Sequence, residues 1–195
     1  IAEKIKGNIS ISPKGKYAFW FSLPDTAWFA YDVAGNKTKS LTKTLPVSFA
    51  DEEDDHPDYP SGYGFAGWLE NDTRFLVYDR YDIWSVDPQG NTPAVNLTKV
   101  GRTQKITFRN VWLNREEKFI KPDANLLLSS FDEQTKTAQY YSYSLKTGEL
   151  KKLTSGNYRY AGVTKTLNSD NILFTRESFS EFPDLWVTNL SFTNP

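Results

Sequence analysis

The stretch FLVYDRYDIWSVDPQGN, residues 75–91, gives the strongest indication of how this chain folds. Its two apolar runs, FLVYD and DIWSV, are separated only by Arg80 and Tyr81. Such a gap is enough for a β-hairpin, whereas a crossover between parallel strands needs about a dozen residues or more. The polar residues that follow, DPQGN, predict a second turn. The stretch therefore predicts antiparallel strands joined by tight turns.

The same pattern recurs along the chain. Leu-Thr pairs end three units, and their threonines, Thr42, Thr98 and Thr154, lie 56 residues apart each time. Each unit has a polar turn, an apolar strand, an aromatic strand and a Gly or Asn turn before its Leu-Thr pair, and most of a fourth unit follows. No long segment carries an i, i+3, i+4, i+7 apolar stripe between clear caps. A meander repeated at this period is typical of β-propeller blades.

We therefore predict an all-β fold, a β-propeller of roughly four blades with about 14 to 16 strands in total. Each blade is expected to be a four-stranded antiparallel meander, and the blades to form an open partial ring in one domain over residues 1–195. The innermost strands are expected near NISIS, FAGWL, TFRNVWL and AGVTKTL. The predicted blades are residues 8–42, 65–98, 107–154 and 161–195, and residues 43–64 form an acidic insertion.

The composition fits this fold and argues against several partners. The 195 residues suffice for one domain of ordinary size or for part of a larger one. Aromatic residues make up 15% of the chain, enough for a core of rings between sheets. The net charge of -1 predicts no nucleic acid or anionic membrane as a partner. The chain contains no run of about 18 apolar residues, so no membrane span is predicted.

Cysteine and methionine are both absent. Without cysteine the chain can form no disulfide, no thiolate nucleophile and no Cys-ligated metal site. The compartment is not fixed by this, and we favour a periplasmic or secreted location over a cytoplasmic one. The chain opens with IAEKIKGN, which contains neither an initiator methionine nor the apolar core of a signal peptide. We expect a segment of a longer protein, with no cofactor.

One rim of the predicted propeller is a candidate for binding. Strands in a meander alternate in direction, so the second connection of every blade and the blade-to-blade connections share one rim. These connections differ in length, and variable loops on a rigid scaffold are where binding usually resides. The candidate residues for contact with a substrate or another domain are Arg80, Tyr81, Asp132, Glu133, Glu177 and Glu181.

The insertion contains an acidic loop, ADEEDDHPDYPSGYG, around His56. Its carboxylates are Asp51, Glu52, Glu53, Asp54, Asp55 and Asp58. Hard cations take several carboxylate oxygens, but the spacing differs from an EF-hand loop and one histidine is too few for a typical zinc site. We therefore predict no metal and expect a solvated loop. Capture of a cationic peptide or of a basic patch on a partner domain is the alternative.

No catalytic residue is predicted. GYGFAG, residues 62–67, matches G-x-G-x-x-G, but an acidic loop precedes it and a strand follows, whereas the dinucleotide fingerprint needs a strand and then a helix. These glycines are expected to permit a turn and close packing near the propeller axis. No G-x-S-x-G elbow is present, since Ser61 follows YP and Ser155 follows LT. His56 is the single histidine, so a Ser-His-Asp triad is not expected.

The motifs DRYDIW, NLT and FPDLW resemble the β-propeller of prolyl oligopeptidase-type serine peptidases, the dipeptidyl-peptidase and acylaminoacyl-peptidase group. Large bacterial members carry stretches similar to YGFAGWLENDTRFLVYDRYDIW and LLLSSFDEQTK of this chain. The resemblance covers most of the chain from about Gly62 on. In that family the propeller caps an α/β-hydrolase domain, restricts access to short peptides and leaves the catalytic triad to the hydrolase domain.

The resemblance thus implies a non-catalytic propeller segment that serves as scaffold and gate. Its implied partners are the α/β-hydrolase domain of the same parent chain and short peptides. The family's paired glutamates for a peptide N-terminus cannot be placed on Glu52 and Glu53, because the flanking motif is not recognisable. The alternative is a stand-alone propeller that binds other proteins. A propeller glycosidase would need inward carboxylates, and the four predicted innermost strands contain none.

Overall fold

The structure is a computed structural model that describes residues 5–114 and 116–193. The chain forms two compact units, the first comprising Ile1–Lys99 and Lys118–Pro122 and the second Val100–Glu117 and Asp123–Pro195. The described residues form fifteen strands, within the predicted range, and their helix is limited to α1 (Gly101–Gln104) and a 3-10 turn. None of these helices is long and apolar enough to cross a membrane. The all-β prediction is confirmed.

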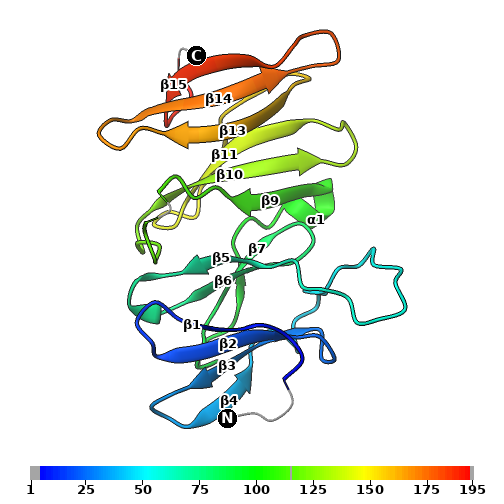
Figure 1. The fold of residues 1–195 in the computed structure, drawn as a ribbon, viewed down its shortest axis with the longest axis vertical. Helices are drawn as coiled ribbons and strands as arrows, with labels where there is room; N and C mark the ends of the chain where they lie inside the picture. The colour runs from blue at the N-terminus through cyan, green and yellow to red at the C-terminus, as the bar shows by residue number, and fades with distance from the viewer. Residues whose placement is uncertain (1–4, 115, 194–195) are drawn as a thin grey trace. The chain divides into compact units, whose positions relative to one another are not determined.

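The first unit contains two four-stranded antiparallel meanders, in which each strand pairs with the next along the chain (Figure 1). The strands of the first meander are β1 (Ile9–Ile11), β2 (Tyr17–Ser22), β3 (Ala27–Asp32) and β4 (Lys37–Ser40). Those of the second are β5 (Phe65–Trp68), β6 (Phe75–Tyr78), β7 (Ile83–Val86) and β8 (Val95–Asn96), with the 3-10 turn Glu70–Asp72 between β5 and β6. Tyr78 pairs with Ile83 across β6 and β7. The predicted hairpin is therefore confirmed.

The second unit contains one seven-stranded sheet (Figure 1). Its strands are β9 (Ile106–Asn110), β10 (Asn125–Asp132), β11 (Ala138–Ser144), β12 (Leu150–Lys152), β13 (Arg159–Lys165), β14 (Asn171–Glu177) and β15 (Asp184–Asn189). The predicted third and fourth blades share this sheet, because β13 pairs in parallel with β11 at Ala138 and Arg159. The fourth blade has three strands among the described residues instead of four, and its expected closing turn, SFTN, extends beyond them.

Aromatic rings form the core of each unit. In the first unit, the ring of Trp68 on β5 stacks on Phe75 and on Tyr17, with centroids 4.6 and 5.6 Å apart. Tyr17 belongs to the first meander, so these rings pack the two meanders against each other. In the second unit, Phe192 lies 5.3 Å from both Tyr140 and Phe174. The aromatic side chains therefore form the packing between the two meanders of the first unit and against the sheet of the second.

The Leu-Thr pairs close the first three blades with the same hydrogen bonds. The hydroxyls of Thr42, Thr98 and Thr154 accept the backbone N–H of Trp28, Ile83 and Tyr140 at 2.9, 3.1 and 2.8 Å. The leucine before each threonine donates its own N–H to the carbonyl of that same third-strand residue. All three threonines are buried. The 56-residue spacing thus reflects hydrogen bonds that recur between the third strand of a blade and the Leu-Thr pair at its end.

The prediction of one domain over residues 1–195, with the blade limits given above, stays a prediction. The expected innermost strands near FAGWL and AGVTKTL coincide with β5 and β13. Those near NISIS and TFRNVWL coincide with β1 and β9.

Candidate functional site

The turn of the DRYDIW hairpin is built around a buried aspartate. Asp79 is 0% exposed, and its Oδ1 accepts the backbone N–H groups of Tyr81 and Asp82, both at 2.6 Å. Its Oδ2 accepts the indole N–H of Trp84 at 3.1 Å. A carboxylate that accepts two backbone donors of a short turn fixes the shape of that turn. Asp79 therefore has a structural role in the hairpin.

The acidic loop is held at its base by backbone and side-chain hydrogen bonds. The backbone N–H of Asp51 donates to the carbonyl of Ser61 at 2.7 Å, and Ala50 forms a bridge with Gly62. Between these two ends of the loop, the hydroxyl of Tyr63 accepts the backbone N–H of Glu52 at 2.7 Å and donates to the carboxylate of Asp51 at 3.2 Å. Burial, and then the nearby carboxylates, raise the pKa of Tyr63 to about 12. The phenol therefore stays protonated and keeps both hydrogen bonds.

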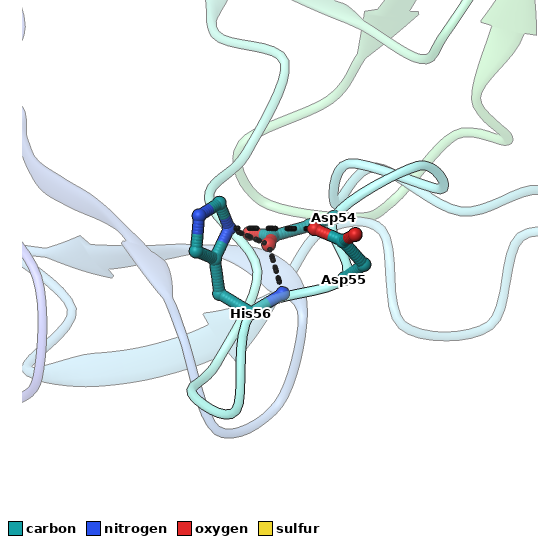
Figure 2. A group of neighbouring side chains, drawn as sticks. All are labelled: Asp54, Asp55 and His56. Carbon is teal, nitrogen blue, oxygen red and sulfur yellow. Dashed lines mark hydrogen bonds and ion pairs between the residues drawn. The ribbon is translucent and has the colours of Figure 1, made fainter.

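Asp54, Asp55 and His56 gather their polar atoms at the tip of the loop (Figure 2). Oδ1 of Asp54 accepts the backbone N–H of His56 at 3.0 Å and lies 2.7 Å from Nδ1 of the same residue. Oδ1 of Asp55 lies farther from the ring nitrogen, at 3.9 Å. The backbone hydrogen bond and then the imidazole lower the pKa of Asp54. The side chains of Asp55 and His56 are 98% and 81% exposed, whereas that of Asp54 is 19% exposed because it is bonded to His56, so the group is a surface turn stabilised by its own hydrogen bonds.

One candidate rim residue contacts the acidic loop. Nη2 of Arg80 lies 2.6 Å from a carboxylate oxygen of Glu53, and its guanidinium lies 5.0 Å from the ring centroid of Tyr81. Tyr81 itself is buried. Arg80 neutralises one carboxylate of the loop, while the side chain of Asp55 is 98% exposed. The loop therefore keeps a net negative charge despite this ion pair.

The candidate rim residues of the second unit are engaged in local interactions. Asp132 accepts the backbone N–H groups of Gln134 and Thr135 at 2.8 and 3.0 Å, and these bonds, that of Thr135 first, lower its pKa. The N–H of Glu133 donates to the carbonyl of Lys105 at 3.0 Å. Asp132 thus shapes the connection between β10 and β11 and offers little to a ligand.

Glu177 and Glu181 form ion pairs at the β14–β15 connection. Glu177 pairs with Arg159 on β13. Glu181 pairs at 3.3 Å with Arg176, whose guanidinium lies 4.0 Å from the ring centroid of Trp186. A cavity of about 250 Å³ lies beside these residues, between the β10–β11 and β14–β15 connections. The variable connections predicted to share a rim are thus adjacent in this unit.

A larger cavity in the first unit was not predicted from the sequence. It measures about 580 Å³ and opens between β1, β2 and the chain that returns from the acidic loop. Its lining residues are Gly7, Asn8, Ser10, Phe19, Phe21, Leu23, Trp28, Gly62, Gly64 and Phe65. A Cβ on Gly62 would lie only 2.9 Å from the ring of Phe21. Close packing is thus found at Gly62, which forms part of a wall of the cavity, whereas a Cβ on Gly64 would make only an ordinary contact with Tyr78 at 3.9 Å.

Comparisons with known proteins show similarity in fold. A putative TolB from Agrobacterium tumefaciens is 17% identical with a TM-score of 0.52, over 96% of this chain and 59% of that protein. An oligogalacturonate lyase from Vibrio parahaemolyticus is 10% identical with a TM-score of 0.58, over 94% of this chain and 49% of that protein. An oligogalacturonate lyase in complex with manganese is 10% identical with a TM-score of 0.52, over 97% and 58%. The fold is of the β-propeller type.

The chain spans about half to three fifths of the length of these propellers. No protein-family model and no curated protein matches the chain. At such low sequence identity the similarity establishes the propeller fold alone. The predicted fold class is confirmed, whereas the resemblance to prolyl oligopeptidases is supported only as far as the propeller.

Within the propeller, the structure brings together some of the predicted site residues. Arg80 and the acidic loop, which were predicted as separate candidates, are joined by an ion pair. The four candidates in the second unit belong to neighbouring connections. The cavity was missed because its walls come from separate segments between Gly7 and Phe65. The glycines of GYGFAG and the aromatic residues at alternate positions of β2 were the signals that could have indicated it.

Proposed function

We propose that the protein is a propeller binding module that takes a basic segment of a protein partner on the acidic loop. The observation that carries the proposal is the ordered base of the loop, where the backbone of Asp51 bonds to Ser61 and the hydroxyl of Tyr63 bonds to both Asp51 and Glu52. A loop whose shape is set before binding loses less conformational entropy on association. Clustered carboxylates attract a cationic partner and discriminate against an anionic one.

The test measures binding of a fluorescent peptide of alternating lysine and glycine, with a glutamate-glycine peptide for comparison. We expect measurable binding of the basic peptide only, weakening as salt is added because exposed charges are screened. The double variant Asp55→Asn/Asp58→Asn should bind roughly three- to tenfold more weakly, as the loss of two exposed ion pairs implies. Glu149→Gln/Asp184→Asn removes the same charge from exposed positions in the other unit and is the matched control.

Equal loss of affinity in both double variants would contradict the proposal, because the effect would then follow net charge and not the loop. Binding of the glutamate peptide with similar affinity would contradict it as well. A periplasmic or secreted location is part of the proposal and can be checked by fractionating cells that produce the full-length protein.

A second candidate is the gate of a prolyl oligopeptidase-like enzyme, favoured by the residues DRYDIW and FPDLW. Its partners would be an α/β-hydrolase domain of the same parent chain and short peptides. The chain by itself should then neither hydrolyse peptidyl chromogenic substrates nor react with a fluorophosphonate probe, whereas the parent protein should do both. A parent gene without a G-x-S-x-G elbow would eliminate this candidate and leave the stand-alone module.

A further inference from the structure

The cavity of the first unit has one wall made by a single sheet face. Side chains alternate across a strand, and Ser10 lies opposite Phe19 while Phe21 lies opposite Trp28 in the strand pairing. Asn8, which precedes Ser10 by two residues, lies on the same face and also lines the cavity. The wall therefore combines three aromatic rings with two small polar side chains at the edge strand β1.

The opposite wall is the chain that leaves the acidic loop. Gly62, Gly64 and Phe65 line the cavity directly after Ser61, whose carbonyl closes the base of the loop. In Figure 1 this loop projects from the first unit between β4 and β5. A ligand in the cavity therefore lies beside rings on both sides, at the foot of a loop with six carboxylates.

Two features of the cavity are unexplained by the fold. Phe65 is 43% exposed although its ring contacts Phe19 and Trp28 at 5.4 and 5.6 Å, which leaves part of an aromatic ring facing the cavity. Trp28 is only 6% exposed, yet its indole N–H has no hydrogen-bond partner among residues 5–114 and 116–193. The exposed ring favours a bound ligand that would cover it, whereas the indole N–H could pair only with an acceptor such as a backbone carbonyl of the partner segment, because lysine and arginine side chains have donors alone.

We propose that this cavity binds the side chain of a lysine or arginine from the partner segment, with its methylene stem against the rings and its cation toward the acidic loop. The inference rests on the proposed function and assigns the residue that the module recognises. Lysine and arginine stems pack along apolar surface while the charged end stays in a polar environment. Aromatic faces also attract cations, whereas a cation buried without carboxylates would be strongly disfavoured.

The experiment separates the stem from the charge. The host is a fluorescent peptide of glycine alternating with 2,4-diaminobutyrate, a cation with a side chain shorter than lysine by two methylenes. Its central cationic residue is left as diaminobutyrate, or replaced by lysine or by norleucine, which keeps the stem without the charge. We expect the lysine peptide to bind about tenfold more tightly than the diaminobutyrate peptide, from the extra methylenes, and more tightly than the norleucine peptide.

Two variants test the walls. Phe65→Ala removes a ring, and Ser10→Trp fills the cavity without removing any wall; each should abolish the preference for lysine over diaminobutyrate while leaving the charge-driven binding. Phe131→Ala is the matched control, because Phe131 is 41% exposed and belongs to the other unit. Circular dichroism and the melting temperature establish whether each variant is folded. The two cavity variants perturb the fold in different ways, one by removing a ring and the other by adding one, so a folding defect in one leaves the other as a test.

Equal affinity for the lysine and diaminobutyrate peptides in the unmodified protein would overturn the cavity inference and leave the proposed function intact. Norleucine binding as tightly as lysine would also overturn it, because the cavity would then take an uncharged side chain. If the unmodified protein bound none of these peptides, the proposed function and the inference would both be overturned. The same would follow if Asp55→Asn/Asp58→Asn left the binding unchanged.

Discussion

At the scale of single residues, buried carboxylates hold the turns of the propeller in place. Asp72 accepts the hydroxyl of Ser12 at 2.6 Å and the backbone N–H of Lys14 at 3.1 Å, so it ties a turn of the second meander to a turn of the first. Asp79 organises the turn of the DRYDIW hairpin in a similar way. A buried aspartate is often taken as a sign of catalysis, but these two are saturated by turn donors.

Replacement of Asp79 by alanine should lower the free energy of unfolding by about 3 kcal/mol. Three donors would lose their acceptor in a site that water does not reach, and each unpaired buried donor costs about 1 kcal/mol or more. Urea denaturation followed by tryptophan fluorescence measures the change. Asp170→Ala, at an exposed position, should stay within about 0.5 kcal/mol of the unmodified protein. Similar losses in both variants would contradict the structural role of Asp79.

Thr98 and Thr42 occupy equivalent positions but should differ in importance. The hydroxyl of Thr98 accepts from the backbone and also donates to Asp82 at 2.6 Å, whereas Ala27 occupies the position equivalent to Asp82 beside Thr42. Thr98→Val should therefore be more destabilising than Thr42→Val by about 1 kcal/mol, since it loses an additional hydrogen bond to a charged group. Equal denaturation midpoints for the two variants would show that the second bond adds nothing.

At the scale of elements, the acidic loop differs from the other connections because it is long and still ordered at its base. The turns after β3 and β10 are each shaped by one aspartate, Asp32 or Asp132, within a few residues. The acidic loop instead depends on contacts between its two ends, at Ala50–Asp51 and Ser61–Tyr63, and on the ion pair between Glu53 and Arg80. Within the part of the chain that the structure describes, the hydrogen bonds of Asp54 and His56 at its tip are made to residues of the loop itself.

Calcium at millimolar concentration should leave the melting temperature nearly unchanged. The oxygen and nitrogen atoms of Asp54, Asp55 and His56 could approach one ion, but all three residues are exposed and Asp54 is already bonded to His56. A site filled at 100 times its dissociation constant would add about 2.7 kcal/mol, which corresponds to an upward shift of several degrees. Such a shift in differential scanning fluorimetry would contradict the prediction of a solvated loop.

The base of the acidic loop should weaken at high pH. The pKa of Tyr63 is raised from 10.0 to about 12 in the folded protein, so its contribution to stability is fully present below pH 10 and is lost as the pH rises toward 12. The Tyr63→Phe variant has no such contribution, and its stability should fall less over this range. Urea midpoints measured at several pH values provide the test. Parallel pH profiles for the two proteins would show that Tyr63 titrates normally.

At the scale of the whole molecule, the second unit presents an apolar sheet face. Leu173 on β14 lies opposite Val187 on β15, and both are exposed together with Leu185. The neighbouring connection adds the exposed rings of Phe179 and Phe182. Ile172 and Phe174 lie on the other, buried face. Exposed apolar side chains gathered on one sheet face tend to be covered by another protein surface.

The isolated chain should therefore self-associate, and charges on this face should prevent it. Leu185→Lys/Val187→Lys should shift sedimentation toward the monomer without a change in far-ultraviolet circular dichroism, because both side chains point away from the core. Lys151→Leu/Lys152→Leu provides the converse control, since it adds apolar residues to exposed positions of β12. A monodisperse monomer of the unmodified chain at high concentration would contradict this prediction.

The sequence by itself determined the strands, their turns and the class of fold. The information is local: side chains alternate with a period of two, and turn residues separate the strands. The Leu-Thr junction repeats because the first three blades close with the same hydrogen bonds. The DRYDIW hairpin was predictable for this reason, from two residues between two apolar runs.

The burial of polar groups and the position of the cavity follow from how distant segments pack together. Asp72 meets Ser12 across 60 positions of sequence, and Arg80 meets Glu53 across 27. Phe19, Trp28 and Phe65 line one cavity although separate strands carry them. The parallel pair that joins β11 to β13 is likewise absent from any local pattern. Burial and desolvation depend on which segments pack together, and this packing is a property of the whole fold.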